Sequence, residues 1–200
     1  MGRRDDKKIH KRNNLFSTAF ELFTTKGFSQ TSIADIVERA EVAKGTFYLY
    51  FKDKYDLREK LIVNRAQKLF DHAIEYSGYR EKENFEDKLI AIVDDILNSM
   101  ENEPKLTAFI TKNVSWAVFH KSLSRSDEDS GYNYLKLLEE EIKKETVPYH
   151  DVEIMLFMII EMVSATGYNA IVDREPVDLK AYKPFLHGGI RNIMKGFKDN

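Results

Sequence analysis

The feature that most constrains this 200-residue chain is the spacing of its apolar residues, which is helical almost from end to end. Near the N-terminus, for example, apolar side chains fall at i, i+3, i+4 and i+7: Phe16, Ala19, Phe20 and Phe23. This spacing places an apolar stripe on one face of an α-helix. No stretch of five or more residues alternates convincingly between apolar and polar, as a half-buried strand would. The sequence therefore predicts an all-α fold.

Composition excludes several other classes of protein. The chain is 42% hydrophobic and 32% charged, which is typical of a globular protein, and it contains no Cys. The missing Cys exclude a disulfide scaffold, a thiolate zinc site and a cysteine nucleophile. We expect no signal peptide, because the first residues are charged. The apolar stretch 154–172 has Glu161 near its middle, so we interpret it as a buried helix and expect no membrane partner and a cytoplasmic protein.

The net charge of −2 conceals an asymmetry between the two ends of the chain. Residues 1–65 carry 14 Lys and Arg against 9 Asp and Glu, whereas the remainder carries 17 against 24. We call residues 1–65 the basic head and the remainder the acidic body. This asymmetry suggests that only the basic head binds a polyanion. Chance clustering of charge is the alternative explanation.

The basic head has the layout of a helix-turn-helix. Gly27 ends the first helix, and Thr31 and Ser32 can cap a second helix that begins at Ile33. The three residues 41–43 form a short break, and residues 44–51 form a third, short helix. A short helix in this arrangement fits the major groove of DNA, where base edges are distinguishable.

Candidate DNA contacts follow from this layout. Phe47 and Phe51 lie one turn apart and would anchor the short helix to the bundle. The remaining polar positions of the second and third helices and the lysines that follow would meet bases and phosphates: Thr31, Ser32, Lys44, Gly45, Thr46, Tyr48, Tyr50, Lys52 and Lys54. The alternative is purely structural, because any small helical bundle needs tight turns and exposes Tyr and Lys.

Two stretches, GFSQTSIADIV (27–37) and AEVAKGTFYLYFKDKYDL (40–57), closely resemble the N-terminal domain of TetR-family transcriptional regulators. The likeness keeps its order and spacing over roughly residues 8–60. It implies a helix-turn-helix DNA-binding domain, placed at 1–55, and a helical ligand-binding and dimerisation domain, placed at 56–200. Members are usually homodimeric repressors that leave a palindromic operator when a small molecule binds. By position, Thr31 and Lys54 resemble the family's phosphate-contacting residues.

The sequence departs from the family pattern at two positions. Glu41 stands where the family usually has Gly in the turn. Because a glutamate adopts positive φ only at a cost, we expect ordinary right-handed backbone there. Tyr50 stands where the family often has His, and it can still donate a hydrogen bond to phosphate.

Signals in the acidic body are weaker. Polar and pliable side chains on its apolar helices are candidates for a ligand pocket: Phe109, Asn113, Trp116, His120, Met158, Glu161, Met162 and Tyr168. Asn113 could instead bond a backbone carbonyl, and Glu161 could bind a cationic ligand or form an ion pair. The helix over 151–172 is apolar nearly all round, so we expect a second copy to cover it in a homodimer through the last two helices.

Enzymatic readings find little support. The five histidines are scattered with no two at i, i+4, and no glycine-rich phosphate-binding motif occurs. We therefore expect no catalytic residues, no metal and no cofactor. Two alternatives stay open beside the ligand-responsive repressor. One is a DNA-binding co-regulator that has no small-molecule pocket and is controlled by a protein partner. The other is a helical enzyme or carrier whose N-terminal basic head is vestigial and no longer binds DNA.

Overall fold

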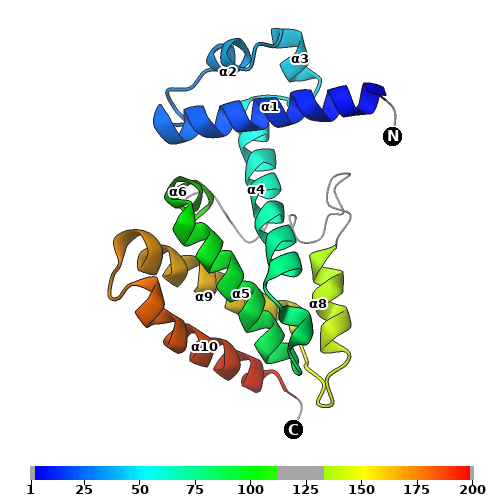
Figure 1. The fold of residues 1–200 in the computed structure, drawn as a ribbon, viewed down its shortest axis with the longest axis vertical. Coiled ribbons are helices and arrows are strands. Elements are labelled where there is room, and N and C mark those ends of the chain that lie inside the picture. The colour runs from blue at the N-terminus through cyan, green and yellow to red at the C-terminus, as the bar shows by residue number, and fades with distance from the viewer. Residues whose placement is uncertain (1–2, 112–132, 199–200) are drawn as a thin grey trace. The chain divides into compact units, whose positions relative to one another are not determined.

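The computed structural model describes residues 3–111 and 133–198, and helices make up nearly all of the regular structure in these ranges (Figure 1). Outside the helices, the described residues contain one isolated bridge, between Tyr149 and Lys198. The chain divides into two compact units, Met1–Ile62 and Val63–Asn200. The division falls inside α4 (Lys54–Tyr76), which contributes to both units. The predicted all-α fold is confirmed.

The first unit contains α1 (Arg3–Thr25), α2 (Ile33–Arg39), α3 (Lys44–Tyr48) and the start of α4. Helices α2 and α3 lie on the same side of the long α1 (Figure 1). The apolar stripe of α1 packs with residues from the other helices of the unit in a shared core: Leu15, Phe16, Ala19, Phe23, Ile36, Val37, Phe47, Phe51, Leu57 and Leu61. This core fixes the two short helices against the long one.

Local caps define the helix ends of this unit. Ser32 is the N-cap of α2: its hydroxyl accepts from the Asp35 amide at 3.1 Å, while its own amide donates to the Asp35 carboxylate at 2.7 Å. This reciprocal pair is a capping box. At the start of α4, Asp53 Oδ1 accepts from the amides of residues 55 and 56 at 2.8 Å each. Helix α3 ends at Tyr48, earlier than the predicted Phe51, and a turn completes the segment.

The second unit contains the rest of α4 and a bundle around it: η1 (Tyr79–Glu81), α5 (Phe85–Asn102), α6 (Pro104–Thr111), α8 (Tyr134–Ile142), α9 (Val152–Tyr168), η2 (Asn169–Asp173) and α10 (Leu179–Gly196). Helices α5 and α9 supply much of a shared apolar core, which includes Phe85, Leu97, Met155 and Ile159. Asn84 caps α5, and its side-chain oxygen accepts from the Asp87 amide at 2.9 Å.

A polar seam joins α10 to α5. His187 Nε2 lies 3.0 Å from the Asp94 carboxylate, and the Arg191 guanidinium donates to the Asp87 carboxylate at 2.7 Å. Both contacts join residues about one hundred positions apart in the sequence. The seam and the apolar core together hold α10 beside α5.

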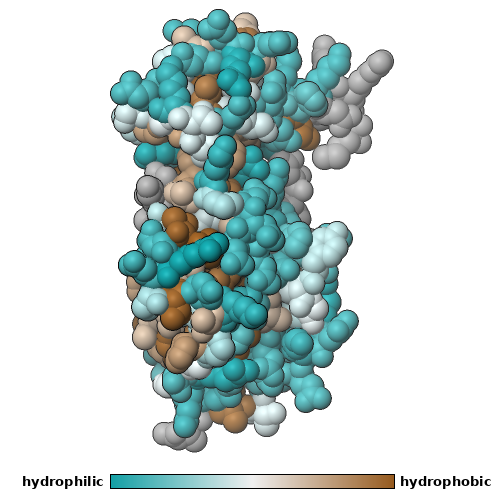
Figure 2. All heavy atoms as spheres, turned by 60° about the vertical axis from the view of Figure 1, so that its left-hand side comes forward, coloured by the Kyte–Doolittle hydropathy of each residue, from teal (hydrophilic) through white to brown (hydrophobic). Residues whose placement is uncertain are grey.

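Helix α9 is only partly covered within its own unit. Met155, Leu156 and Ile159 are buried, whereas Ile154, Phe157 and Met158 are exposed. By length and composition the segment Val152–Asp173 could cross a membrane, and 33% of its most apolar window is buried within the described structure. Hydrophobic side chains gather on the surface of this unit in Figure 2, amid hydrophilic ones. The helix therefore has one face in the core and one apolar face without cover from its own chain's described residues.

Candidate DNA interface and internal cavity

The turn between α2 and α3 is a Schellman motif with a glutamate at its left-handed position. Glu41 has φ +53°, its amide donates to Glu38 O at 3.1 Å, and the Val42 amide donates to Val37 O at 3.0 Å. These two bonds satisfy carbonyls at the end of α2, and they require left-handed backbone at the residue that follows the cap. The expectation of right-handed backbone at Glu41 was therefore wrong, because the hydrogen bonds of the motif outweigh the steric cost of its side chain.

Thr31 and Lys54, both predicted to contact phosphate, instead hold the loop between α1 and α2. Thr31 is 1% exposed, and its hydroxyl donates to Gly27 O at 2.8 Å. Lys54 Nζ donates to Phe28 O and to Thr31 O, each at 2.8 Å. We correct the assignment of Thr31, because its hydroxyl is buried and already bonded. Lys54 keeps one of its three N–H donors for another acceptor.

Most of the other predicted contacts lie on the surface. Ser32, Lys44, Gly45, Tyr48 and Lys52 are exposed, while Thr46 and Tyr50 are half-buried. Lys44, Gly45 and Tyr48 all belong to α3, which Phe47 anchors with its fully buried ring. The helix thus presents a cation, an open backbone position and a phenol on one short element.

Sequence reasoning missed Leu49 as a possible DNA contact. It is 78% exposed and follows directly after the last residue of α3. An apolar side chain of this kind can contact the methyl group of thymine in the major groove. The sequence did offer one indication of this. Leu49 lies between Phe47 and Phe51, whose rings are buried, and it does not share their helix face.

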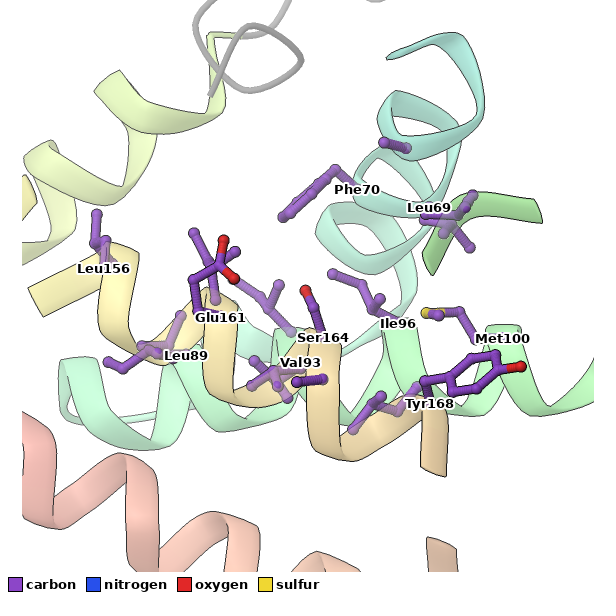
Figure 3. A pocket seen from close by; sticks show the side chains of 18 of the residues that line it. Leu69, Phe70, Leu89, Val93, Ile96, Met100, Leu156, Glu161, Ser164 and Tyr168 are labelled. Atoms are coloured by element: carbon purple, nitrogen blue, oxygen red, sulfur yellow. The ribbon is translucent and has the colours of Figure 1, made fainter. Parts of the chain in front are cut away.

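The second unit contains a cavity of about 350 Å³ that is partly open to solvent, since Glu161 and Ala165 on its wall are exposed. This volume lies at the lower end of the range of about 300–1,000 Å³ that small-molecule sites occupy. Its wall is largely apolar and comes from α4, α5, α6, α8 and α9: Ala66, Leu69, Phe70, Leu89, Ile92, Val93, Ile96, Leu97, Met100, Ile110, Leu138, Leu156, Ile159, Ile160, Glu161, Val163, Ser164, Ala165 and Tyr168. Figure 3 shows side chains from several of these helices converging on one space.

The polar groups of the cavity wall sit on one face of α9. Glu161, Ser164 and Tyr168 are spaced i, i+3 and i+7, so they share a helix face. In Figure 3 the side chains of Glu161 and Ser164 point into the same space that Phe70 enters from α4, and Tyr168 lies farther along, near Met100. The described wall is therefore largely apolar, with a line of oxygen atoms along one side, and Glu161 at one end of that line is exposed to solvent.

The structure brings together only part of the pocket predicted from the sequence. Glu161 and Tyr168 line the cavity, but Phe109, Met158 and Met162 are not among the described residues of its wall. Met158 is exposed instead, and Asn113, Trp116 and His120 lie outside the described residues. Sequence reasoning missed Ser164 and the wall from α4 and α5. Spacing from Glu161 could have found Ser164, whereas the α4 and α5 residues carry no signal apart from being apolar.

Comparisons with known proteins match the N-terminal helices, which include α2 and α3. Residues 15–61 match the family model described as bacterial regulatory proteins, tetR family. The probable HTH-type transcriptional regulator YttP of Bacillus subtilis is 29% identical over 109 residues, which cover 54% of this chain and 52% of that protein. The chain thus spans about half the length of this curated relative.

Solved structures share the fold over nearly the whole chain. A putative tetR family transcription regulator from Shewanella sp. PV-4 superposes with a TM-score of 0.67 at 20% identity, covering 95% of this chain and 99% of that one. The transcriptional regulator FadR from Bacillus subtilis, solved in complex with stearoyl-CoA, superposes with a TM-score of 0.56 at 21% identity, covering 92% and 98%. At these identities the likeness establishes the fold.

Proposed function

Because the chain belongs to the TetR family through its N-terminal domain, we propose that it is a sequence-specific DNA-binding transcriptional repressor that works in the cytoplasm as a homodimer. The observation that carries this proposal is the helix-turn-helix of α2 and α3, which lies within the residues matched by the family model. Its second helix is anchored by Phe47 and exposes Lys44 and Tyr48. From the sequence, the DNA-binding domain was placed at residues 1–55 and the ligand-binding and dimerisation domain at residues 56–200, whereas the compact N-terminal unit runs to Ile62.

Each subunit would place α3 in a major groove. Tyr48 and Thr46 would face base edges, while Lys44, Lys52 and the Ser32 hydroxyl would contact phosphates. The two copies of α3 in a dimer would read half-sites about 34 Å apart, one turn of the double helix, or somewhat more. The operator would accordingly be an inverted repeat.

A small-molecule effector would act through the cavity. Its apolar wall suits an elongated hydrophobic body, and the stearoyl-CoA complex of FadR provides an example of a long-chain ligand in a protein of this fold. The effector would favour a dimer whose recognition helices no longer match the operator spacing, which is a shift of population. The cavity also weighs against the co-regulator without a pocket, for which a closed core would be expected.

Selection of binding sites from random duplex DNA, at one stated salt and protein concentration, tests the proposal. We expect enrichment of an inverted repeat, because a two-fold dimer presents two equivalent recognition helices. If ligand-free protein enriches no sequence, the proposed function is wrong. An enriched direct repeat or single half-site would overturn the symmetric dimer but keep the DNA-binding role.

A further inference from the structure

The N-terminal part of α1 is strongly basic and extends out of the core of its unit. Residues 3–14, which we call the basic arm, carry six Lys and Arg against two Asp, a net charge of +4 with His10 neutral. Lys7, Lys8 and Lys11 are exposed, and from residue 7 onward Leu15 is the first residue of α1 that is buried. In Figure 1 the N-terminal end of α1 runs on past α3.

The lysines of the basic arm continue the face of α1 that packs in the core. Lys11 and Lys8 precede Leu15 by four and seven residues, so they share its helix face. Asn14, three residues after Lys11, donates from its side chain to Ala40 O at 2.8 Å, at the end of α2. The face of α1 that contacts the helix-turn-helix therefore becomes a row of exposed cations where the helix leaves the bundle.

Other cations of this unit are neutralised by neighbouring carboxylates. Lys26 lies 2.8 Å from Asp35, and Lys60 lies 3.0 Å from Asp56. Within residues 3–111 and 133–198, the three exposed lysines of the basic arm form no ion pair. Even full pairing with the two Asp of the arm would leave most of its positive charge uncompensated. Concentrated charge of one sign on one surface attracts a polyanion.

We propose that the basic arm is a second DNA contact, in which Lys7, Lys8 and Lys11 bind phosphates beside the bases that α3 reads. The inference rests on the proposed function, because it adds a contact to the same interface. Phosphate contacts add affinity and position the protein but carry no sequence information. Lys7 lies seven residues before Asn14, about 10 Å along the helix axis, which corresponds to about three base pairs at roughly 3.4 Å each. The arm would widen the contacted stretch of DNA by that amount.

Continuity with the proposed interface favours DNA over an acidic protein as the occupant of this surface. The turn to which Asn14 donates leads directly into α3, whose first residue, Lys44, is also exposed. Lys44 likewise forms no ion pair within the described ranges. The uncompensated cations of α1 and α3 therefore belong to one compact unit, and a single DNA backbone can neutralise both groups.

The salt dependence of binding to the selected inverted repeat, measured with the full-length protein, tests the proposal. The combined variant Lys7→Gln, Lys8→Gln and Lys11→Gln removes three charges, and Gln preserves helix propensity. Each lost phosphate contact lowers the slope of log K against log salt concentration by about 0.9 in magnitude. We expect the slope to fall by at least about 1 and binding at about 0.1 M salt to weaken about tenfold. Replacement of the same three lysines by Arg should preserve the slope.

A matched control removes the same charge from the second unit. Lys82, Lys136 and Lys143 are exposed there, and their combined replacement by Gln should leave the slope unchanged. Thermal melting of each variant reports whether it folds. Phosphate ethylation interference then locates the contacts of the basic arm: positions that impair binding of the wild-type protein but not of the arm variant should lie within about three base pairs of the bases read by α3.

Three results would overturn the inference. An unchanged slope in the arm variant would mean a solvated helix end or a surface for another protein. An equal fall in the control would reflect overall charge alone, and a changed recognition sequence would mean that the arm reads bases. Site selection separates this inference from the proposed function. An inverted repeat with an unchanged slope contradicts the inference alone. Binding to random duplex DNA that depends on the arm, with no sequence selected, contradicts the proposed function alone.

Discussion

At the residue scale, Glu41 bears a backbone conformation that its side chain disfavours. Its φ of +53° belongs to the left-handed region, where a non-glycine residue costs about 1–2 kcal/mol. The turn keeps that conformation because the amides of Glu41 and Val42 satisfy carbonyls at the end of α2. The chain thus stores strain in the turn that orients α3.

We expect Glu41→Gly to stabilise the protein by about 1 kcal/mol, because glycine adopts positive φ without steric cost. Chemical denaturation measures the change. Glu38→Gly is the matched control, since Glu38 is exposed within α2 and its replacement should destabilise by about 1 kcal/mol. Equal destabilisation by both variants would show that the turn carries no strain.

The stabilisation that Asp35 contributes at the N-terminus of α2 depends on pH. A hydrogen bond from Lys26 Nζ at 2.8 Å, followed by bonds from the backbone and side chain of Ser32, lowers the pKa of Asp35 from 3.8 to about 2. The unfolded chain therefore binds a proton more readily than the folded one between these values. The stabilisation by this carboxylate is present above pH 3.8 and is lost as the pH falls toward 2.

Lys26→Met should raise the pKa of Asp35 part of the way back to 3.8, because the Ser32 bonds remain. A carboxyl-carbon NMR titration measures it directly. Lys52→Met, which removes a lysine near Asp56 rather than Asp35, should leave the Asp35 titration unchanged. An unchanged Asp35 pKa in Lys26→Met would mean that the capping box alone lowers this pKa.

The exposed residues of α3 should divide into two kinds of DNA contact. Tyr48→Ala should cost about 1–3 kcal/mol on the selected site and relax the preference at one base position. Lys44→Ala should weaken binding to all sequences and lower the salt slope by about 1, as expected for the loss of a phosphate contact. Lys136→Ala, an exposed lysine on α8, is the control and should change neither quantity. Binding isotherms at several salt concentrations test both variants, and identical behaviour of Lys44→Ala and Lys136→Ala would remove α3 from the interface.

At the element scale, helix existence was predictable because caps and apolar stripes are local features. Ser32 and Asn84 both cap helices as their sequence context indicates. The burial of Thr31 was not predictable, because it depends on the carbonyl of Gly27 and on Lys54, which approaches from the next helix but one. The end of α3 at Tyr48 was not predicted either: beyond it the amides of Leu49 and Tyr50 bond carbonyls three residues back, those of Thr46 and Phe47, so the segment continues as a turn.

Close packing of α9 on α5 should respond to one added methyl group. A Cβ at Gly167 would lie 2.8 Å from Leu97 Cδ2, whereas a Cβ at Gly188 in α10 would meet no atom within 4 Å. We expect Gly167→Ala to destabilise by about 1–2 kcal/mol, because Leu97 must shift toward the cavity that it lines. Gly188→Ala should instead stabilise by up to about 1 kcal/mol through helix propensity. Thermal and denaturant unfolding compare the two, and equal effects would mean that Leu97 yields freely.

At the scale of the whole molecule, the cavity marks the limit of sequence reasoning. The described part of its wall draws on five helices, and most of the residues in that part are leucine, isoleucine or valine, which look the same as core residues in a sequence. Glu161 stood out because a charge interrupts an apolar helix, and Tyr168 lies on the same face. The residues of α4 and α5 became wall residues only through tertiary packing.

The uncovered face of α9 and α10 also belongs to this scale. Phe185 on α10 is 74% exposed, and Ile154, Phe157 and Met158 on α9 are spaced i, i+3 and i+4, so they form one apolar stripe. Exposed apolar groups of this kind mark interaction sites in soluble proteins. A two-fold axis would let the stripe of one copy cover that of the other, in keeping with the proposed dimer.

Phe185→Asp and Met158→Asp should each shift the protein toward monomer, because a carboxylate in the contact would lose water without gaining a partner. Sedimentation velocity at micromolar concentration measures the mass, and we expect the dissociation constant to rise at least about tenfold, which corresponds to 1.4 kcal/mol. Val147→Asp is the control, since Val147 is also an exposed apolar residue but lies outside both helices. The monomeric variants should keep their N-terminal units folded but lose affinity for the inverted repeat. Two recognition helices joined in one dimer bind two half-sites more tightly than two separate subunits do. A Phe185→Asp protein that remains dimeric, or one that dissociates yet keeps its full operator affinity, would contradict the arrangement.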